Sequence, residues 1–158
     1  MSDAKFEDAG ESALHLKALE PDDLPVISSL VQDAVFPVTE MAWQPRQRRF
    51  ALLLNRFRWE DVPAAERRGR DFERVQAVLL IDEVQKVSSQ GIDRAEKDMV
   101  LSVLAIVFEP GEDGAGRVVI TLAGDGAIAC QVEALDVTLK DVTRPYIAPS
   151  RSVPRHPE

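Results

Sequence analysis

The sequence contains few of the residues that disulfides and metal sites require. It has one cysteine, Cys130, and two histidines, His15 and His156, which lie near opposite ends of the 158 residues. One cysteine cannot form an internal disulfide, and a zinc site built from cysteine and histidine would lack ligands. We therefore expect no disulfide, no metal and no other cofactor, and a reducing compartment.

Long hydrophobic runs are missing as well. The longest apolar run spans 103–108, whereas a membrane helix needs about 18 residues or more. Residues 1–12 are acidic, and no apolar stretch near them is long enough for a secretory signal. We expect a soluble cytoplasmic protein that does not associate with membranes.

The charge is acidic overall but unevenly distributed. The formal net charge is −8, and such a field repels phosphate backbones, so bulk nucleic-acid binding is disfavoured on electrostatic grounds. Nine of the chain's 14 arginines nevertheless fall within 46–74, against five acids. That segment has a charge of +4 and the rest of the chain −12, which makes it the most distinctive electrostatic feature of the sequence.

Composition and length predict one folded domain. Apolar residues make up 45% and charged residues 29% of the chain, close to the averages of globular proteins. We expect a single globular domain over 13–145, between a flexible acidic tail at 1–12 and a flexible proline-containing tail at 146–158.

Hydrophobic patterning predicts more strands than helices. The expected elements are a short strand at 14–19, a helix at 21–32, an edge strand at 35–43, a turn at 45–48, and strands at 50–59, 75–82 and 99–108. Pro37 favours the edge position, because proline cannot donate to a sheet ladder. The 50–59 segment is apolar on both strand faces, although a helical stripe fits it as well.

The clearest local signal is a β-hairpin. Alternating apolar residues at 118–122 and 128–132 flank Gly124-Asp125-Gly126, a typical turn sequence. After it, Leu135, Leu139 and Val142 have helical spacing and predict a closing helix; a bulged strand is the alternative. The predicted fold class is α+β, with a curled, mostly antiparallel β-sheet and about two helices. A pleckstrin-homology-like roll, ending in a helix that plugs an open barrel, is one compatible topology.

Arginine and aromatic residues interleave along 48–60. Guanidinium groups bind phosphate and stack on rings, so this segment is a candidate surface for an anion or an RNA end. Its candidate ligand-binding residues are Arg48, Arg49, Asn55, Arg56, Arg58 and Trp59. The structural alternative is that Arg56 and Arg58 pair with Glu60 or other acids while the aromatic rings fill the core.

No pattern in the sequence predicts catalysis. The nucleophile elbow of α/β-hydrolases and the paired histidines of zinc proteases are both missing. Cys130 alternates with inward-facing residues, which indicates a buried, inert thiol. Arg67-Arg68-Gly69-Arg70 is interpreted as a solvated loop between strands. No catalytic residue is assigned, and enzymatic activity is left open.

Four motifs resemble a known family. They are Leu-Lys-Ala-Leu-Glu at 16–20, Gln-Asp-Ala-Val at 32–35, Arg-Arg-Phe-Ala-Leu-Leu-Leu-Asn-Arg-Phe-Arg-Trp-Glu at 48–60, and Gly-Ala-Ile with Val-Glu within 126–133. Together they resemble a bacterial family catalogued as domain of unknown function 2948, over about residues 14–145. The resemblance implies a bacterial cytosolic protein and assigns no activity, cofactor or catalytic residue.

Two functional hypotheses follow. The first is a non-catalytic protein-interaction module that uses an exposed sheet edge or the arginine–aromatic segment to bind a partner or a second copy of itself. The alternative is a protein, with or without enzymatic activity, that binds a phosphate-containing ligand or an RNA end through the arginine-rich segment 46–74.

Overall fold

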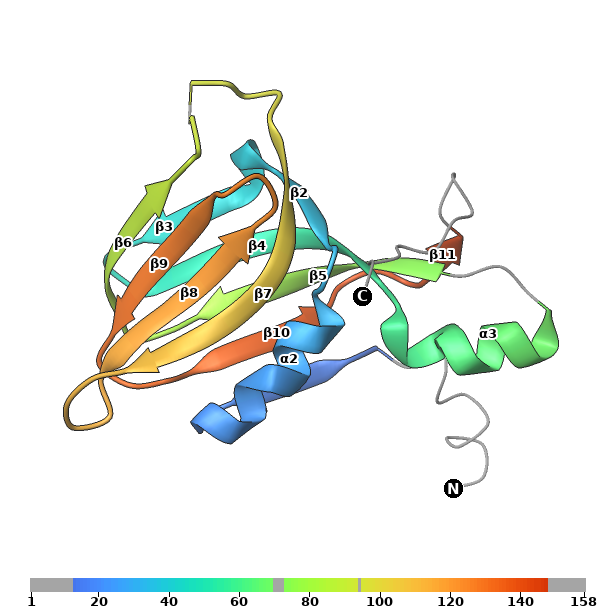
Figure 1. The fold of residues 1–158 in the computed structure, drawn as a ribbon, viewed down its shortest axis with the longest axis horizontal. Coiled ribbons are helices and arrows are strands. Elements are labelled where there is room, and N and C mark those ends of the chain that lie inside the picture. Colours follow the sequence, from blue (N-terminus) through green and yellow to red (C-terminus); the bar gives the residue numbers. More distant parts are fainter. Residues whose placement is uncertain (1–12, 70–72, 94, 148–158) are drawn as a thin grey trace.

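The computed structural model describes residues 13–69, 73–93 and 95–147. These residues form one strongly curled antiparallel sheet of eleven strands, with two short α-helices (Figure 1). The predicted α+β class with a curled, mostly antiparallel sheet is confirmed.

The strands are β1 (His15–Ala18), β2 (Val35–Pro37), β3 (Met41–Gln44), β4 (Arg49–Phe57), β5 (Glu73–Ile81), β6 (Val84–Gln90), β7 (Val100–Pro110), β8 (Gly116–Leu122), β9 (Ala127–Val132), β10 (Val137–Asp141) and β11 (Tyr146–Ile147). The helices are α2 (Leu24–Leu30) and α3 (Val62–Arg68), and the 3-10 turns are η2 (Pro21–Asp23), η3 (Val38–Glu40) and η4 (Trp59–Asp61). The sheet order is β1-β10-β5-β4-β2-β7-β8-β9-β6, with β3 attached to β4 and β11 to β5. Strands β1 and β6 are therefore the two ends of the sheet.

The core lies on the concave side of the sheet. Phe50 and Leu52 of β4 pair in register with Ile81 and Leu79 of β5, and all four side chains are buried. This alternation confirms the strand predicted at 50–59, although β4 ends at Phe57. Apolar residues also occur on the other face of β4, and the side chains on both faces are at least half-buried.

The predicted hairpin is formed by β8 and β9. Ile120 lies opposite Ile128, and both are buried. At the turn, Gly124 and Asp125 have φ values of 81° and 68°. This left-handed region favours glycine, asparagine and aspartate, so the Gly-Asp-Gly sequence matches the geometry of the turn.

The predicted helix at 21–32 is present as the turn η2 followed by α2. Leu24 and Ile27 are buried, and α2 packs against β7 and β1 (Figure 1). The Ser28 hydroxyl accepts a hydrogen bond of 2.9 Å from the backbone N–H of Ile106. The helix thus covers part of the β7 edge that no strand pairs with, which satisfies a backbone donor there.

The edge strand predicted at 35–43 is confirmed only in its second part, where β3 pairs with β4 alone among the described strands. The segment divides into β2, the turn η3 and β3, and β2 lies between β4 and β7 inside the sheet. Pro37 is the last residue of β2, opposite Val100. A proline at the end of so short a strand does not interrupt the ladder.

The closing helix predicted after residue 132 is wrong, and the alternative, a strand, is observed. Val137, Leu139 and Asp141 of β10 alternate inward and are buried, whereas Val142 is 48% exposed. Leu135 lies in the preceding loop, so its spacing to Leu139 only resembles a helical pattern. The described residues therefore have no closing helix of the kind expected from a pleckstrin-homology-like roll.

The second helix of the structure is α3, which was not predicted. Pro63 lies in its first turn, and Gly69, at φ 64°, donates its N–H to the last turn. These are ordinary start and stop signals. Only Ala65 is buried, so no apolar stripe marks the helix. Arg67 and Arg68 lie in its last turn, so their predicted position in a loop is wrong.

The predicted tails lie mostly outside the described residues, which exclude 1–12 and 148–158. Residues 146 and 147 form β11, which pairs with the start of β5. No described helix has the length and apolar character needed to cross a bilayer.

Two valines near the C-terminal end of the domain distinguish strand from helix. Val137 is fully buried, whereas Val142, which a helical stripe would have buried, is exposed. We expect Val137→Ala to lower the free energy of unfolding by about 2 kcal/mol or more, because it leaves a cavity. Val142→Ala should change it by less than about 0.5 kcal/mol. Urea denaturation of both variants measures the difference, and the reverse order would contradict the strand.

Candidate functional site

The six residues predicted to bind a ligand fall into two groups at opposite ends of β4. Arg48 and Arg49 lie at its start, and the other four, Asn55, Arg56, Arg58 and Trp59, lie at or just after its end. A strand rises about 3.3 Å per residue, so Arg49 and Arg56 are roughly 23 Å apart along it. The structure therefore does not bring the six residues together in one site.

The arginines at the start of β4 are engaged in ion pairs. Arg48 Nη2 lies 2.8 Å from Glu133 Oε2, and Arg49 Nε lies 2.8 Å from Asp82 Oδ1. The hydrogen bond from Arg48 lowers the pKa of Glu133 and raises the pKa of Arg48. These pairs are partly exposed, so their contribution to stability is small.

Arg56 is fully buried and binds two carboxylates at once. Its Nε and Nη2 donate to both oxygens of Asp141 at 2.9 Å, while Nη1 and Nη2 donate to Glu60 at 2.9 and 2.7 Å. Nη1 also lies 3.3 Å from the Phe57 carbonyl oxygen. Burial alone would lower the pKa of Arg56, but the hydrogen bonds to Glu60 and Asp141 outweigh it, and the net pKa is raised.

Arg58 belongs to the same group of charges. It is 2% exposed, and its Nη1 donates to the Glu73 carboxylate. The same nitrogen lies 3.6 Å from Asp61 Oδ2, and Arg58 Nε lies 3.8 Å from Glu60 Oε2. We call the group the ionic cluster; it consists of Arg56, Arg58, Glu60, Asp61, Glu73 and Asp141.

The ionic cluster joins several elements at one end of the core. Arg56 lies on the inward-facing side of β4, and Asp141 lies on the inward-facing side of β10. Strand β5 lies between these two strands. Asp141 Oδ2 also accepts a 3.0 Å hydrogen bond from the backbone N–H of Leu14, just before β1. One carboxylate therefore connects three parts of the chain.

The other two predicted residues also have partners within the chain. Trp59 Nε1 donates to the Gln32 carbonyl oxygen at 2.9 Å, and its ring packs edge-on against Phe57 at 4.7 Å. Asn55 Oδ1 accepts from Arg74 Nη1 at 3.4 Å. These contacts match the structural alternative considered from the sequence, as does the pairing of Arg56 with Glu60. The ligand-binding role of the six residues stays a prediction.

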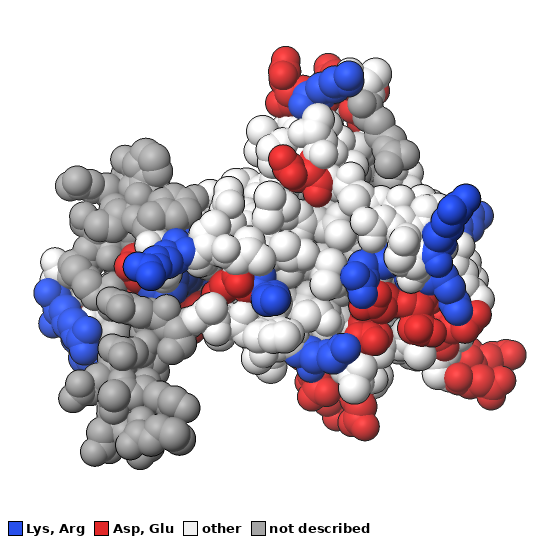
Figure 2. Space-filling view, turned by 180° about the vertical axis from the view of Figure 1, so that it is seen from behind, with Lys and Arg blue, Asp and Glu red and all other residues white. Residues whose placement is uncertain are grey.

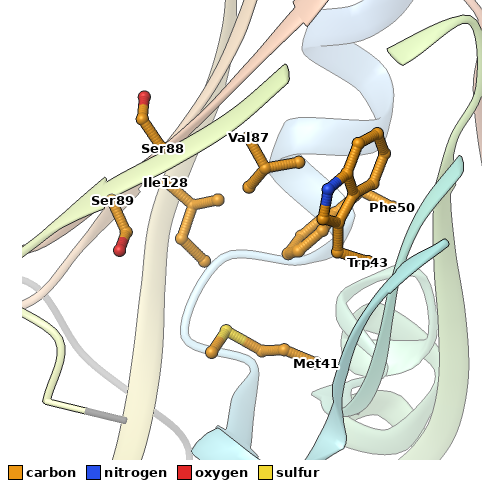
Figure 3. A pocket seen from close by; sticks show the side chains of 7 residues that line it. All are labelled: Met41, Trp43, Phe50, Val87, Ser88, Ser89 and Ile128. Atoms are coloured by element: carbon orange, nitrogen blue, oxygen red, sulfur yellow. The ribbon is translucent and has the colours of Figure 1, made fainter. Parts of the chain in front are cut away.

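A different feature of the sheet has the form of a binding site. Among the described strands, β6 is the last of the sheet and pairs only with β9, and β3 pairs only with β4. Figure 3 shows β6 and β3 on opposite sides of a pocket. We call this opening between the two strands the β3–β6 seam. It is closed at one end by a 2.9 Å hydrogen bond from the Val84 N–H to the Arg48 carbonyl oxygen.

The pocket of the seam is small and mostly apolar. Its volume is about 90 Å³, and its lining residues are Met41, Trp43, Phe50, Val87, Ser88, Ser89 and Ile128. Val87 lies opposite the buried Cys130 and packs partly buried against the core, whereas Ser88 and Ser89 are exposed. The volume exceeds that needed by one water but falls below the roughly 300–1,000 Å³ of small-molecule sites. It suits one aliphatic side chain.

The free edge of β6 is only partly protected. Native edge strands use charges, prolines and bulges to prevent pairing with other chains. The register shift between Val84 and Lys86, and the charge of Lys86 itself, protect the start of β6. Residues 87–90 follow in regular register and have no charge. This half of the edge can accept another strand.

Sequence patterning missed β6 because most of its side chains are polar and exposed. The sequence signal at its end is Gly91, at φ 72°, whereas Glu83 before the strand, at φ 62°, is not a residue type that predicts a left-handed turn. Strands bounded by such turns need no apolar face when they lie at an edge.

Cys130 is buried on β9 and is not part of the pocket lining. Desolvation raises the pKa of its thiol to about 12. Among the described residues, no group of three or more histidine, cysteine, aspartate and glutamate side chains could hold a metal ion. The described part of the chain therefore has neither an activated thiol nor a metal-binding group.

Removing the buried guanidinium should be far more costly than removing an exposed one. We expect Arg56→Met to lower the free energy of unfolding by about 3–5 kcal/mol, because two carboxylates lose their buried partner. Arg117, paired with Glu109 on the surface at 2.6 Å, gives the control: Arg117→Met should cost less than about 1 kcal/mol. Equal shifts of the urea midpoint would contradict this account of the ionic cluster.

The raised pKa of Cys130 predicts an unreactive native thiol. At about pH 8 we expect iodoacetamide to modify the protein only in denaturant, since the native thiol is buried and protonated. Unfolding lets the thiol ionise, so the free energy of unfolding should fall as the pH rises from about 9 toward 12. Mass spectrometry follows the modification, and rapid native labelling would refute the burial.

Comparison with known proteins identifies the family. No curated protein and no solved structure matches the chain. One family model matches residues 14–156, nearly the whole chain, and is described as "Protein of unknown function (DUF2948)". The resemblance seen in the sequence motifs is thereby confirmed, and the chain belongs to the DUF2948 family.

Proposed function

We propose that this protein is a non-catalytic interaction module that binds an extended segment of a partner protein in the β3–β6 seam. The segment adds a strand to the free edge of β6 and places one side chain in the apolar pocket. The observation that carries the proposal is the uncharged edge at 87–90 beside that pocket. Strand addition of this kind takes affinity from backbone hydrogen bonds and specificity from side-chain pockets.

The chemistry of the pocket supports binding in preference to catalysis. Its lining has two serine hydroxyls and no carboxylate, histidine, cysteine or basic side chain. General acid–base chemistry needs a titratable group within hydrogen-bond distance of the reacting atom. An apolar side chain, in contrast, would be well accommodated between Trp43, Val87 and Ile128.

The alternative function, binding of a phosphate-containing ligand or an RNA end by segment 46–74, has less support. Arg48, Arg49, Arg56 and Arg58 all face carboxylates of this chain. The ionic cluster holds two guanidinium groups against four carboxylates, so a phosphate would replace favourable pairs and meet like charges. We therefore assign Arg56 and Arg58 a structural role.

We place the module in the bacterial cytoplasm. The single, buried cysteine is compatible with a reducing compartment, and the net charge of −8 disfavours bulk nucleic-acid binding. The partner is a protein.

Two adjacent serines test the free edge. Along a strand, backbone N–H groups point alternately to the two sides, so one of Ser88 and Ser89 faces β9 and the other faces the seam. We expect one of Ser88→Pro and Ser89→Pro to lose about 1 kcal/mol or more of stability through a broken β9 hydrogen bond. The other should keep its melting temperature and bind a strand partner at least about tenfold more weakly.

The measurement is selection from a display library of random twelve-residue peptides on the wild-type protein, followed by titration of the enriched peptides. The stable proline variant is the matched control, since it differs at one residue of the edge. Enrichment lost on that variant supports the proposal. No enrichment over the variant, or unchanged affinity for it, would overturn it.

A further inference from the structure

We propose that the segment bound in the seam is the free C-terminal end of a partner protein, whose terminal carboxylate lies at the closed end of the seam. This inference rests on the proposed function and specifies which part of the partner binds. It follows from the direction in which the segment runs, from the hydrogen bond that closes the seam, and from the basic residues beside that bond.

The sheet favours one direction for an added strand. Every pair of neighbouring strands in the described sheet is antiparallel, and antiparallel pairs are slightly more stable per residue than parallel ones. A segment that pairs antiparallel with β6 runs from the Gln90 end of that strand toward Val84. Its C-terminal residues therefore approach Lys86, at the closed end of the seam.

The closed end stops the added strand. The N–H of Val84 already donates to the Arg48 carbonyl oxygen at 2.9 Å, so it cannot pair with an added strand. Arg48 lies between β3 and β4, and this turn occupies the place beside Val84 that the next residue of the segment would need. The regular register of β6 also ends here, at the shift between Val84 and Lys86. A segment paired with residues 87–90 must therefore end, or bend out of the sheet, beside Lys86.

Two basic side chains flank the closing hydrogen bond. Arg46 lies in the same turn as Arg48, and Lys86 lies two residues after Val84; both are exposed and form no salt bridge among the described residues. Two residues of chain extend at most about 7 Å, so the long side chains of both can reach a carboxylate at this point. Figure 2 shows basic side chains on the right of that view, where the turn between β3 and β4 lies, next to acidic ones.

The acids at the closed end do not neutralise these two groups. Glu133 and Asp82 are paired with Arg48 and Arg49 at 2.8 Å each. Glu83 is the remaining acid of the turn between β5 and β6, so two basic groups face one carboxylate. A strand that ends here in the favoured direction carries a C-terminal carboxylate, which complements this excess of positive charge. Capture of a C-terminal carboxylate is a recognised mode of peptide binding, as is strand addition.

The test presents the random twelve-residue library in two formats, one with free C-terminal carboxylates and one with each peptide followed by a Gly-Gly-Ser extension. We expect enrichment from the free-end format alone. The enriched peptides should share an aliphatic residue within about the last four positions, because the pocket lies beside residues 87–89 of β6.

Two changes to an enriched peptide separate charge from steric fit. Amidation of its C-terminus should weaken binding about tenfold at low salt. In about 1 M salt, where the screening length is about 3 Å, this difference should largely disappear. Extension by two residues should weaken binding about tenfold or more at both salt concentrations, because the turn between β3 and β4 blocks the added residues.

The protein variant Arg46→Gln with Lys86→Gln tests the basic pair. It should bind the free-carboxylate peptide about tenfold more weakly than the wild type does, and the amidated peptide equally well. The control, Lys140→Gln with Arg144→Gln, removes the same charge from exposed residues in and after β10 and should leave both affinities unchanged.

Equal enrichment from both formats, or an amidated peptide that binds as tightly as the free one, would overturn the C-terminal segment and leave the seam as a site for internal strands. Failure of both formats to enrich peptides over the stable proline variant would overturn the proposed function. Sedimentation of the free protein as a dimer that the stable proline variant dissociates would overturn it too, by assigning the edge to a second copy.

Discussion

The fold depends on one buried guanidinium. Arg56 has no exposed surface and holds the carboxylates of Asp141 and Glu60, so it connects β4, β10 and the turn before α3. A charge in an apolar interior is tolerated only when its hydrogen bonds are satisfied, and removal of either partner leaves the other uncompensated. The ionic cluster therefore sets where the C-terminal strand β10 and the segment before β1 meet the rest of the sheet.

This constraint also affects the interpretation of function. Arginines next to aromatic residues suggest an anion site, but two of these arginines are engaged in the interior of their own chain. The surface with unpaired backbone groups lies at the other end of β4. There the sheet curls back without closing, and β6 faces β3 across an apolar pocket. The backbone groups of an edge strand are obligatory hydrogen-bonding groups, so an uncharged edge beside a pocket favours another strand.

Sequence patterning predicted the elements whose apolar residues face the core. The Phe50–Leu52–Leu54 alternation and the hairpin around Asp125 have local signals, and both are present. Patterning did not predict β6 and α3, which bury few side chains, and it assigned a helix to β10 because loop residue Leu135 simulated a helical repeat. The pairing of Arg56 with Asp141 joins residues 85 apart in the chain, and no local pattern encodes it. The same holds for the seam, which exists only because distant strands curl toward each other.

Amide hydrogen exchange along β6 tests the central claim most directly. In the free protein, the amides of residues 87–90 should alternate between slow exchange, where the N–H bonds to β9, and fast exchange, where it faces the seam. Binding of an enriched peptide should slow the fast amides selectively, with little change in β7 and β8. Uniformly slow exchange at all four residues of the free protein, or peptide protection located elsewhere, would contradict an open edge that receives a partner strand.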